Sequence, residues 1–528
     1  MKHAFGFRHA AAAALSLTLL TGVQAKEFRY STSGDILGLD PFINNEGPTN
    51  TMKSNFYEGL LHRSHDLSLQ PALATDWKQT DDLTWRFNLR KGVKFHNGNA
   101  FTADDVITSL ERIRHPKSNM TFVVTTIDKI NKIDDHTIDI VTKAPDPILL
   151  LKIPSFWIMD KEWLEENKAM IVAEGATVKT YANLNVNGTG PFKLKEWVAD
   201  TRTVLVPNPN WWGKPEHNLT KAIFTPIGNN ATRVAALLSG EIDLMYPVPL
   251  QDVPRLNNTK GISALEGPEL RTIFLGFNQK IDELVEMPGT GKNPFKDVRV
   301  RKAFYQAIDI KAIKRVVMRK ASAPTALMVA PGINGFQEDM NKRFKFDPKA
   351  AKKLLADAGY PNGFPVTLDC PNDRYVNDEA ICLAIIPMLK RVGIDVKLNA
   401  QTKSLHFAKI GRKENYNTSF FLLGWTPSSL DAHNPLQQLM TLDGEGQGTW
   451  NCGRYSNPKV EQLTDLIEKE TNQNKRNAMI REAFTIHQND VGHIPLHQQA
   501  LAWGVGAKVK DIKQRPNNDV DLRYVTMK

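Results

Sequence analysis

Few residues of this chain have the types and the spacing of a catalytic or metal-binding motif. His493 and His497 are four residues apart, but Pro495 between them argues against a helix face that presents both rings to a metal. Residues 288–293 are similar to a phosphate-binding loop, but Asn293 replaces the Ser or Thr of that motif. G-x-S-x-G and H-E-x-x-H are absent from the sequence. These patterns predict that the protein is not an enzyme and holds no metal ion or cofactor.

One enzyme alternative stays open. A glycosidase needs only two suitably placed carboxylates, and the chain has 57 acidic residues. A secreted hydrolase is therefore the most distant of the functions we consider.

The three cysteines do not form a metal-binding pattern either. Cys370, Cys382 and Cys452 include no C-x-x-C pair, so a zinc site is not expected. In an oxidising compartment Cys370 and Cys382 could close a short loop, which would leave Cys452 unpaired. Spacing alone leaves this pairing open.

The N-terminal segment predicts export. Lys2 and Arg8 precede a short apolar run at residues 10–20, and small residues at 23–25 provide a cleavage site. The run is too short to span a bilayer, which takes about 20 residues. We expect residues 1–25 to be a removable signal peptide and the mature chain to be a soluble periplasmic protein. Removal of this segment lowers the net charge from +10 to +8.

Size and charge restrict the remaining possibilities. About 500 mature residues exceed what one hydrophobic core usually serves, so several domains are expected. Basic side chains are scattered among acidic ones and form no stripe with interleaved aromatic residues, so no nucleic-acid partner is expected. Helices and strands alternate over the second half of the chain, which predicts an α/β architecture. The expected elements are helices at 297–308, 348–358 and 379–392, and strands at 366–370 and 396–399.

Six segments in a fixed order carry a resemblance to a known family. The longest is residues 69–112, which ends in a helix that Thr102 is expected to cap. The others are 187–192 (NGTGPF), 208–213 (NPNWWG), 233–243 (RVAALLSGEID), 293–303 (NPFKDVRVRKA) and 347–359. Together they resemble the family 5 extracellular solute-binding proteins, which include receptors for peptides, opines and nickel.

This resemblance implies a two-lobed periplasmic binding protein fold of the large, type II-like class, with an extra inserted domain and a ligand cleft between the lobes. Crossovers between the lobes are expected near residues 276–278 and 501–503. The implied division is lobe I at 26–57, 185–278 and 503–528, the inserted domain at 58–184, and lobe II at 279–502.

The resemblance also implies contacts on lobe II. In peptide-binding relatives a Gly-Trp pair ends a strand at the cleft, and an Asp three residues after the Trp receives the peptide ammonium. Here the pair ends at Trp425, followed by Thr426, and the Asp position is Ser428. Asp431 is the remaining carboxylate of the segment, and it either anchors a cationic group or begins the next helix.

Two further sets of contacts follow from the same resemblance. The loop Asn45, Glu46 and Gly47 is expected to run along a peptide backbone. Phe274 and Asn278, near the first crossover, are weaker candidates.

The function implied is a monomeric periplasmic receptor that captures an oligopeptide or peptide-like solute. It would deliver that solute to the permease and ATPase subunits of an ABC importer. Because Ser428 replaces the usual Asp, a receptor for an opine, a sugar conjugate or a nickel complex is the alternative.

Overall fold

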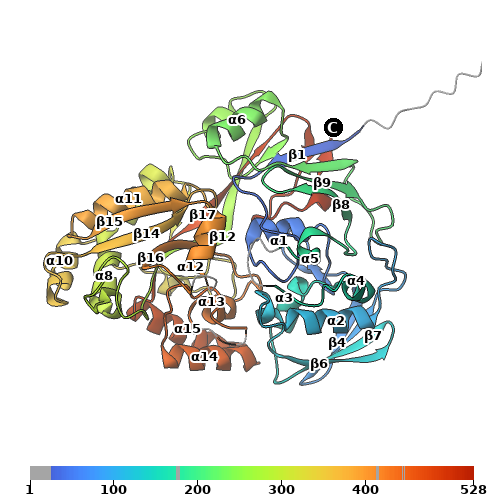
Figure 1. Ribbon diagram of the computed structural model, residues 1–528, viewed down its shortest axis with the longest axis horizontal. Coiled ribbons are helices and arrows are strands. Elements are labelled where there is room, and N and C mark those ends of the chain that lie inside the picture. Colours follow the sequence, from blue (N-terminus) through green and yellow to red (C-terminus); the bar gives the residue numbers. More distant parts are fainter. Residues whose placement is uncertain (1–24, 174–178, 412–414, 443, 445) are drawn as a thin grey trace, which may run out of the picture.

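Two long neighbouring strands run between the two halves of the molecule (Figure 1). The computed structural model describes residues 25–173, 179–411, 415–442, 444 and 446–528, so nearly all of the predicted signal peptide lies outside the described residues. The two strands are β12 (Ser263–Phe277) and β17 (His493–Val505), which pair antiparallel. They belong to an 11-stranded sheet in the order β15-β14-β16-β12-β17-β11-β1-β10-β9-β8, with β13 on β17.

The first half of the sheet is built from both ends of the chain. Its strands are β1 (Glu27–Ser31), β8 (Phe192–Val198), β9 (Arg202–Pro207), β10 (Lys221–Phe224) and β11 (Leu244–Met245). Helices α1 (Gly47–Lys53), α6 (Asn230–Ser239) and α7 (Val253–Asn257) accompany them, with a C-terminal pair of strands, β18 (Val509–Asp511) and β19 (Thr526–Met527). The C-terminal tail therefore returns to the half that contains β1.

A smaller antiparallel sheet, in the order β4-β5-β7-β6, lies beside this half. Its strands are β4 (Ala74–Asp81), β5 (Thr84–Leu89), β6 (Ile127–Asp134) and β7 (Thr137–Thr142), with the hairpin β2 (Leu61–Arg63) and β3 (Leu69–Pro71) nearby. Its helices are α2 (Ala103–Ile113), α3 (Leu149–Lys152), α4 (Lys161–Glu166) and α5 (Tyr181–Leu184). Thr102 and Asp105 form a capping box at the start of α2, which confirms the predicted cap.

The second half is the α/β layer predicted for the later part of the chain. Strands β14 (Pro365–Pro371) and β15 (Asp395–Gln401) are parallel, and β14 also pairs with β16 (Phe420–Trp425). The short strand β13 (Ala323–Pro324) lies on β17. Its helices are α8 (Val298–Ala307), α9 (Ile310–Ala312), α10 (Pro348–Asp357), α11 (Asp378–Lys390), α12 (Lys403–Ile410), α13 (His433–Leu439), α14 (Pro458–Lys469) and α15 (Gln473–Asn489).

Strand pairing marks where the chain passes between the halves. Up to Pro268, β12 pairs only with the end of β17; from Thr272 it also pairs with β16 of the second half. A register shift separates Pro268 from Thr272, upstream of the crossover expected near residues 276–278. One buried cluster joins the first half to the small sheet, so the segment at 58–184 shares a core with lobe I. We call the halves lobe I and lobe II below.

The cysteine pairing that spacing left open is settled by the structure. Cys370 and Cys382 form a disulfide, and Cys452 is free and buried. No helix in the described part of the chain is long and apolar enough to cross a membrane.

Candidate ligand-binding site between the lobes

A cavity of about 220 Å³ lies at the interface of the two lobes. Its wall includes the loop at 45–47 with α1, residues 57–63, β12 at Arg271, the lobe II segments at 374–375 and 423–430, and the C-terminal tail at 515–523. The predicted residues Asn45, Glu46, Gly47, Trp425, Thr426 and Ser428 all line it. Their role as ligand contacts remains a prediction.

Glu46 joins the lobes at one edge of this cavity. Its carboxylate caps α1 by accepting the backbone N–H of Thr49 at 2.9 Å, and Nζ of Lys403 from lobe II lies 3.4 Å away. Nε of Arg374 lies 2.8 Å from Oε1, but its N–H does not point at that oxygen, so this contact is an ion pair without a hydrogen bond. Burial alone would raise the pKa of Glu46, but Lys403, Arg374 and Thr49 together lower it to about 2.

Two arginines converge on Gly47. Their distance from Gly47 can be expressed through the place that a side chain would take there. A Cβ atom at position 47 would lie 3.0 Å from Nη2 of Arg374 and 3.4 Å from Nη2 of Arg271. Both guanidinium groups also flank the ring of Tyr375, at 4.9 and 5.8 Å from its centroid. Nε of Arg271 donates to Glu269, but the terminal nitrogens of both arginines donate to no described residue. The cavity therefore presents unused donors that suit a carboxylate or phosphate.

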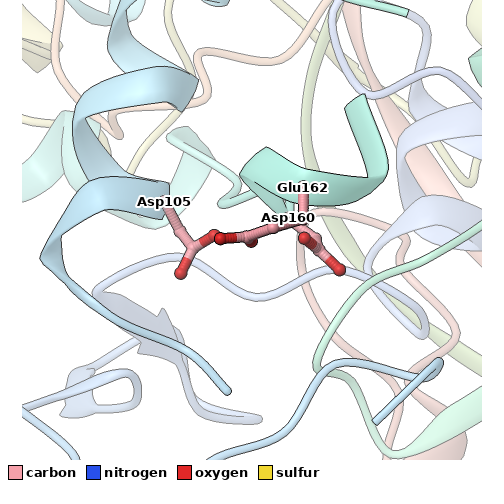
Figure 2. Close-up of side chains that lie close together, drawn as sticks. All are labelled: Asp105, Asp160 and Glu162. Atoms are coloured by element: carbon pink, nitrogen blue, oxygen red, sulfur yellow. The ribbon is translucent and has the colours of Figure 1, made fainter. Parts of the chain in front are cut away.

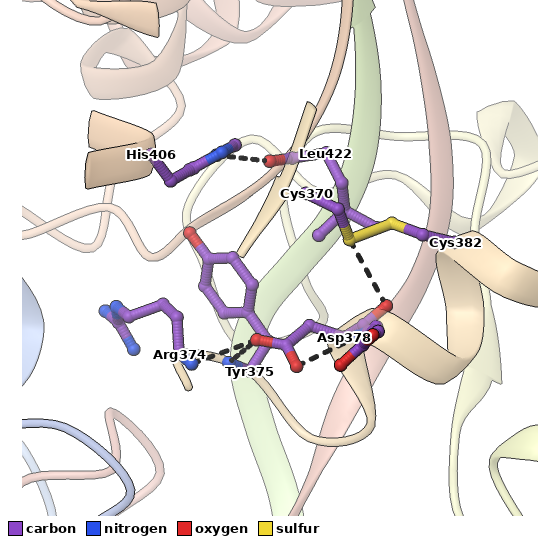
Figure 3. Close-up of a disulfide and its surroundings, with 8 residues drawn as sticks. Cys370, Arg374, Tyr375, Asp378, Cys382, His406 and Leu422 are labelled. Atoms are coloured by element: carbon purple, nitrogen blue, oxygen red, sulfur yellow. Dashed lines mark hydrogen bonds between the residues drawn. A yellow bond between two sulfur atoms is a disulfide. The ribbon is translucent and has the colours of Figure 1, made fainter. Parts of the chain in front are cut away.

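The loop that carries Arg374 and Tyr375 is held at several points (Figure 3). The Cys370–Cys382 disulfide joins the end of β14 to α11 across this loop. Asp378 accepts the backbone N–H groups of Arg374 and Tyr375, each at 2.9 Å. These contacts fix the backbone from which the Arg374 side chain reaches the cavity.

Aromatic side chains cover another wall. The ring of Trp450 lies 6.2 Å from Trp425 and 5.5 Å from Phe407, and all three line the cavity. Nε1 of Trp425 donates to Oδ1 of Asn434 at 2.8 Å, which fixes the indole. This wall offers flat apolar surface beside the arginines.

Several buried polar atoms of the cavity wall have no hydrogen-bond partner among the described residues. They are Oδ1 of Asn50 and Asn517, Nδ1 of His62, Oγ1 of Thr426, Nε1 of Trp450, and Nε of Arg374 and Arg515. Buried polar groups are nearly always hydrogen-bonded, so this concentration marks where a polar ligand would bind.

The C-terminal tail contributes cavity residues that sequence reasoning missed. Arg515, Asn517, Asp519 and Arg523 line the cavity from lobe I. The tail was expected to return to an earlier domain, and its dense run of charged and amide side chains was the available signal.

The structure corrects the expectation that Asp431 is a free anchor. Its carboxylate is fully buried, does not line the cavity, and forms a two-pronged ion pair with Arg476 at 2.7 and 2.8 Å. It also accepts the backbone N–H of His433 at the start of α13. Burial alone would raise the pKa of Asp431, but Arg476 holds it below its usual value. Asp431 thus has the helix-start role that was its alternative.

Phe274 and Asn278 are also outside the cavity. Phe274 is buried against His493, with ring centroids 5.2 Å apart. Asn278 donates to the backbone of Tyr416 and Thr418, so its side chain supports strand ends rather than a ligand.

Three carboxylates lie close together away from the cavity, from Asp105, Asp160 and Glu162 (Figure 2). Oδ2 of Asp160 accepts from three amides, those of Asn97, Asn99 and Asn187, at 2.8 to 2.9 Å. Because donors already saturate this oxygen, a cation would have to displace them, and we assign no metal site here.

Comparisons with known proteins agree with this geometry. The model of the bacterial extracellular solute-binding proteins, family 5, matches residues 68–447. The chain belongs to this family. The family 5 resemblance predicted from the six sequence segments is therefore confirmed.

Two relatives align with the family 5 chain over most of their length. Heme-binding protein A of Haemophilus influenzae is 28% identical over 514 residues, covering 93% of this chain and 90% of the relative. A glutathione-binding protein, GsiB of Salmonella choleraesuis, is 25% identical over 496 residues, covering 92% of each.

A solved family 5 structure supports the two-lobed fold. The periplasmic binding protein DppA of Helicobacter pylori, in complex with the peptide STSA, superimposes with a TM-score of 0.83 and 26% identity. The match covers 95% of this chain and 98% of that one. The predicted periplasmic binding protein fold is confirmed by this similarity.

Proposed function

We propose that this protein is a periplasmic receptor that captures a small anionic, peptide-like solute for an ABC importer. The observation that carries the proposal is the interlobe cavity lined by Arg271 and Arg374, whose terminal guanidinium nitrogens donate to no described residue. Buried arginine forks of this kind bind carboxylates through charge-assisted hydrogen bonds.

The charge of the wall supports an anionic ligand. Five arginines line the cavity against three acidic residues. One of those acids is Glu58, and burial raises its pKa, which favours its neutral form. Behind the wall Glu269 pairs with Arg271, and Asp521 pairs with Arg515 and Arg523, so cationic side chains still outnumber the charged acids.

Cavity size supports a small solute. The volume of about 220 Å³ is below the roughly 300–1,000 Å³ of sites for drug-sized ligands. A short peptide or conjugate suits this space better than a long peptide. Two of the three relatives named above, the glutathione-binding protein and the protein solved with the peptide STSA, support the same class, while the third is named a heme-binding protein. An opine, a sugar conjugate or a nickel complex remains the alternative class.

The mechanism we propose is capture by closure. A ligand that touches Arg374 of lobe II and the loop at 45–47 of lobe I binds the closed form better than the open form, and this difference shifts the equilibrium. Release to permease and ATPase subunits then requires reopening. The receptor acts as a monomer and performs no turnover.

Calorimetry on the purified protein tests the proposal. The probes are glutathione and Ala-Ala-Ala. The affinity of each is compared with that of a derivative whose carboxylates are converted to amides. We expect the acids to bind and the amides to bind roughly 10- to 150-fold more weakly, since a charge-assisted contact contributes about 1.5–3 kcal/mol.

A variant pair assigns that difference to one residue. Arg374→Gln should abolish the preference for the acids over the amides, even where the lost contact with Glu46 weakens both, while the exposed Arg391→Gln on the same lobe should keep that preference. If neither acid binds the wild-type protein, the peptide-like class is wrong. If acids and amides bind equally, the anion-binding role of the arginines is wrong.

A further inference from the structure

Asp519 is a carboxylate of the cavity wall that has no cationic partner. It comes from the C-terminal tail and lines the cavity from lobe I. Thr51 donates its hydroxyl to Oδ1 at 2.7 Å, and the amide of Asn517 donates to Oδ2. No described residue forms an ion pair with it. Burial raises the pKa of Asp519, because these two neutral donors and the more distant Arg515 and Arg271 do not offset the loss of water.

The other two acids of the wall are already occupied. Glu46 faces Arg374 and Lys403 across the lobe interface. Glu58 accepts three hydrogen bonds, from the indole N–H groups of Trp211 and Trp212 at 3.2 and 2.8 Å and from the Thr189 hydroxyl at 2.8 Å. Asp519 accepts two hydrogen bonds and forms no ion pair with a described residue, so it has the most capacity for an additional donor.

Two unpartnered acceptors lie in the same cavity wall as Asp519. Oδ1 of Asn517, its hydrogen-bond neighbour, is buried without a donor among the described residues. Oδ1 of Asn50, next in sequence to Thr51, is buried in the same condition. An ammonium group carries three N–H donors and no acceptor, so it suits a set made of one carboxylate and two amide oxygens.

We propose that Asp519 receives a cationic group of the ligand, the ammonium of a peptide-like solute. The inference rests on the proposed function and deepens it. It assigns the carboxylate that binds the ligand's ammonium to the C-terminal tail of lobe I. Ser428 has no charge, and Asp431 is buried in an ion pair with Arg476. Lobe I then holds the positive end of the ligand and Arg374 of lobe II holds the negative end. The preferred ligand is a zwitterion that spans the lobe interface.

The test compares Asp519→Asn with Asp511→Asn. Asp511 belongs to the same tail but is exposed, and it forms a surface ion pair with Lys513 at 3.1 Å. The substitution at 519 is compatible with the fold, because turning the amide of Asn517 would present its Oδ1 to the new side chain. The probes are Ala-Ala-Ala and glutathione, each with its N-acetylated form, measured by calorimetry.

We expect N-acetylation to weaken binding to the wild type and to Asp511→Asn by roughly 10- to 150-fold. In Asp519→Asn the free and acetylated probes should bind equally, at the affinity of the acetylated probe for wild type. If Asp519→Asn lowers the affinities for the free and the acetylated probe by the same factor, residue 519 acts only on the fold and the inference is wrong. The inference is also wrong if acetylation still weakens binding to Asp519→Asn. If acetylation has no effect on wild type, Asp519 binds no ammonium, although the proposed function stands. If no probe binds wild type, the proposed function fails as well.

Discussion

Asp431 and Arg476 show how a buried ion pair can occupy a residue that looks available in the sequence. Both side chains are almost completely buried, and the pair connects the segment after β16 to α15. Removing one partner of a buried pair leaves the other as an unpaired charge in a dry interior. The pair therefore belongs to the stability of lobe II rather than to ligand recognition.

Asp431→Asn should lower the free energy of unfolding by roughly 3–5 kcal/mol and leave ligand affinity of the folded protein unchanged. Chemical denaturation with calorimetry measures both quantities. Asp339→Asn is the matched control. Asp339 pairs at 2.7 Å with Arg481, which belongs to α15 as Arg476 does, but this pair lies on the exposed surface. The control should barely change stability. A stable Asp431→Asn protein with weakened binding would restore Asp431 as an anchor.

At the scale of elements, the loop between β14 and α11 connects the fold to the cavity. The disulfide spans 12 positions of sequence and encloses Arg374 and Tyr375 (Figure 3). Closing a loop of this length restricts the unfolded chain and stabilises the folded one by roughly 3 kcal/mol. It also limits how far Arg374 can move from the ligand.

Replacing Cys370 and Cys382 together with alanine should therefore have two effects. The free energy of unfolding should fall by roughly 3 kcal/mol, and affinity for an anionic ligand should fall several-fold because the Arg374 backbone gains freedom. Denaturation and calorimetry measure these, and reduced wild-type protein serves as the comparison. Loss of stability with unchanged affinity would limit the disulfide to a stabilising role.

Local signals in the sequence were sufficient for many elements but not for the whole site. Thr102 and Asp105 are three residues apart, so the start of α2 could be predicted from neighbours alone. Trp425 and the loop at 45–47 could be placed at the cavity through family resemblance. Arg271 and Arg374 could not, because their meeting at Gly47 depends on packing between segments far apart in the chain.

For the whole molecule, the contacts between lobes decide how easily the cavity opens. Glu46 joins the lobes beside the ligand site, and Glu468 of α14 does so at a second point. Glu468 accepts from Thr125 at 3.1 Å and lies 3.6 Å from Lys152. These contacts join the lobes in the described conformation without any ligand.

Glu46→Gln should shift the protein toward the open form and weaken ligand binding, while the exposed Glu111→Gln should not. Because the pKa of Glu46 in the closed form is lowered to about 2, its contribution is complete above its ordinary pKa and is lost as pH falls toward 2. Small-angle scattering with ligand, from pH 5 to pH 2, should show wild type expanding toward the dimensions of Glu46→Gln. Identical scattering of both proteins at pH 5 would contradict this role.

The C-terminal tail also determines when a complete cavity first exists. A chain is synthesised from its amino end, so the tail residues at 515–523 are the last part of the cavity wall to be made. About 90 residues separate Trp425 from Arg515, an interval of roughly 5–20 s at ordinary rates of synthesis. Until that interval ends the cavity wall is unfinished. Recognition of solute is then acquired in one late step, because a chain without residues 515–523 lacks part of the cavity wall.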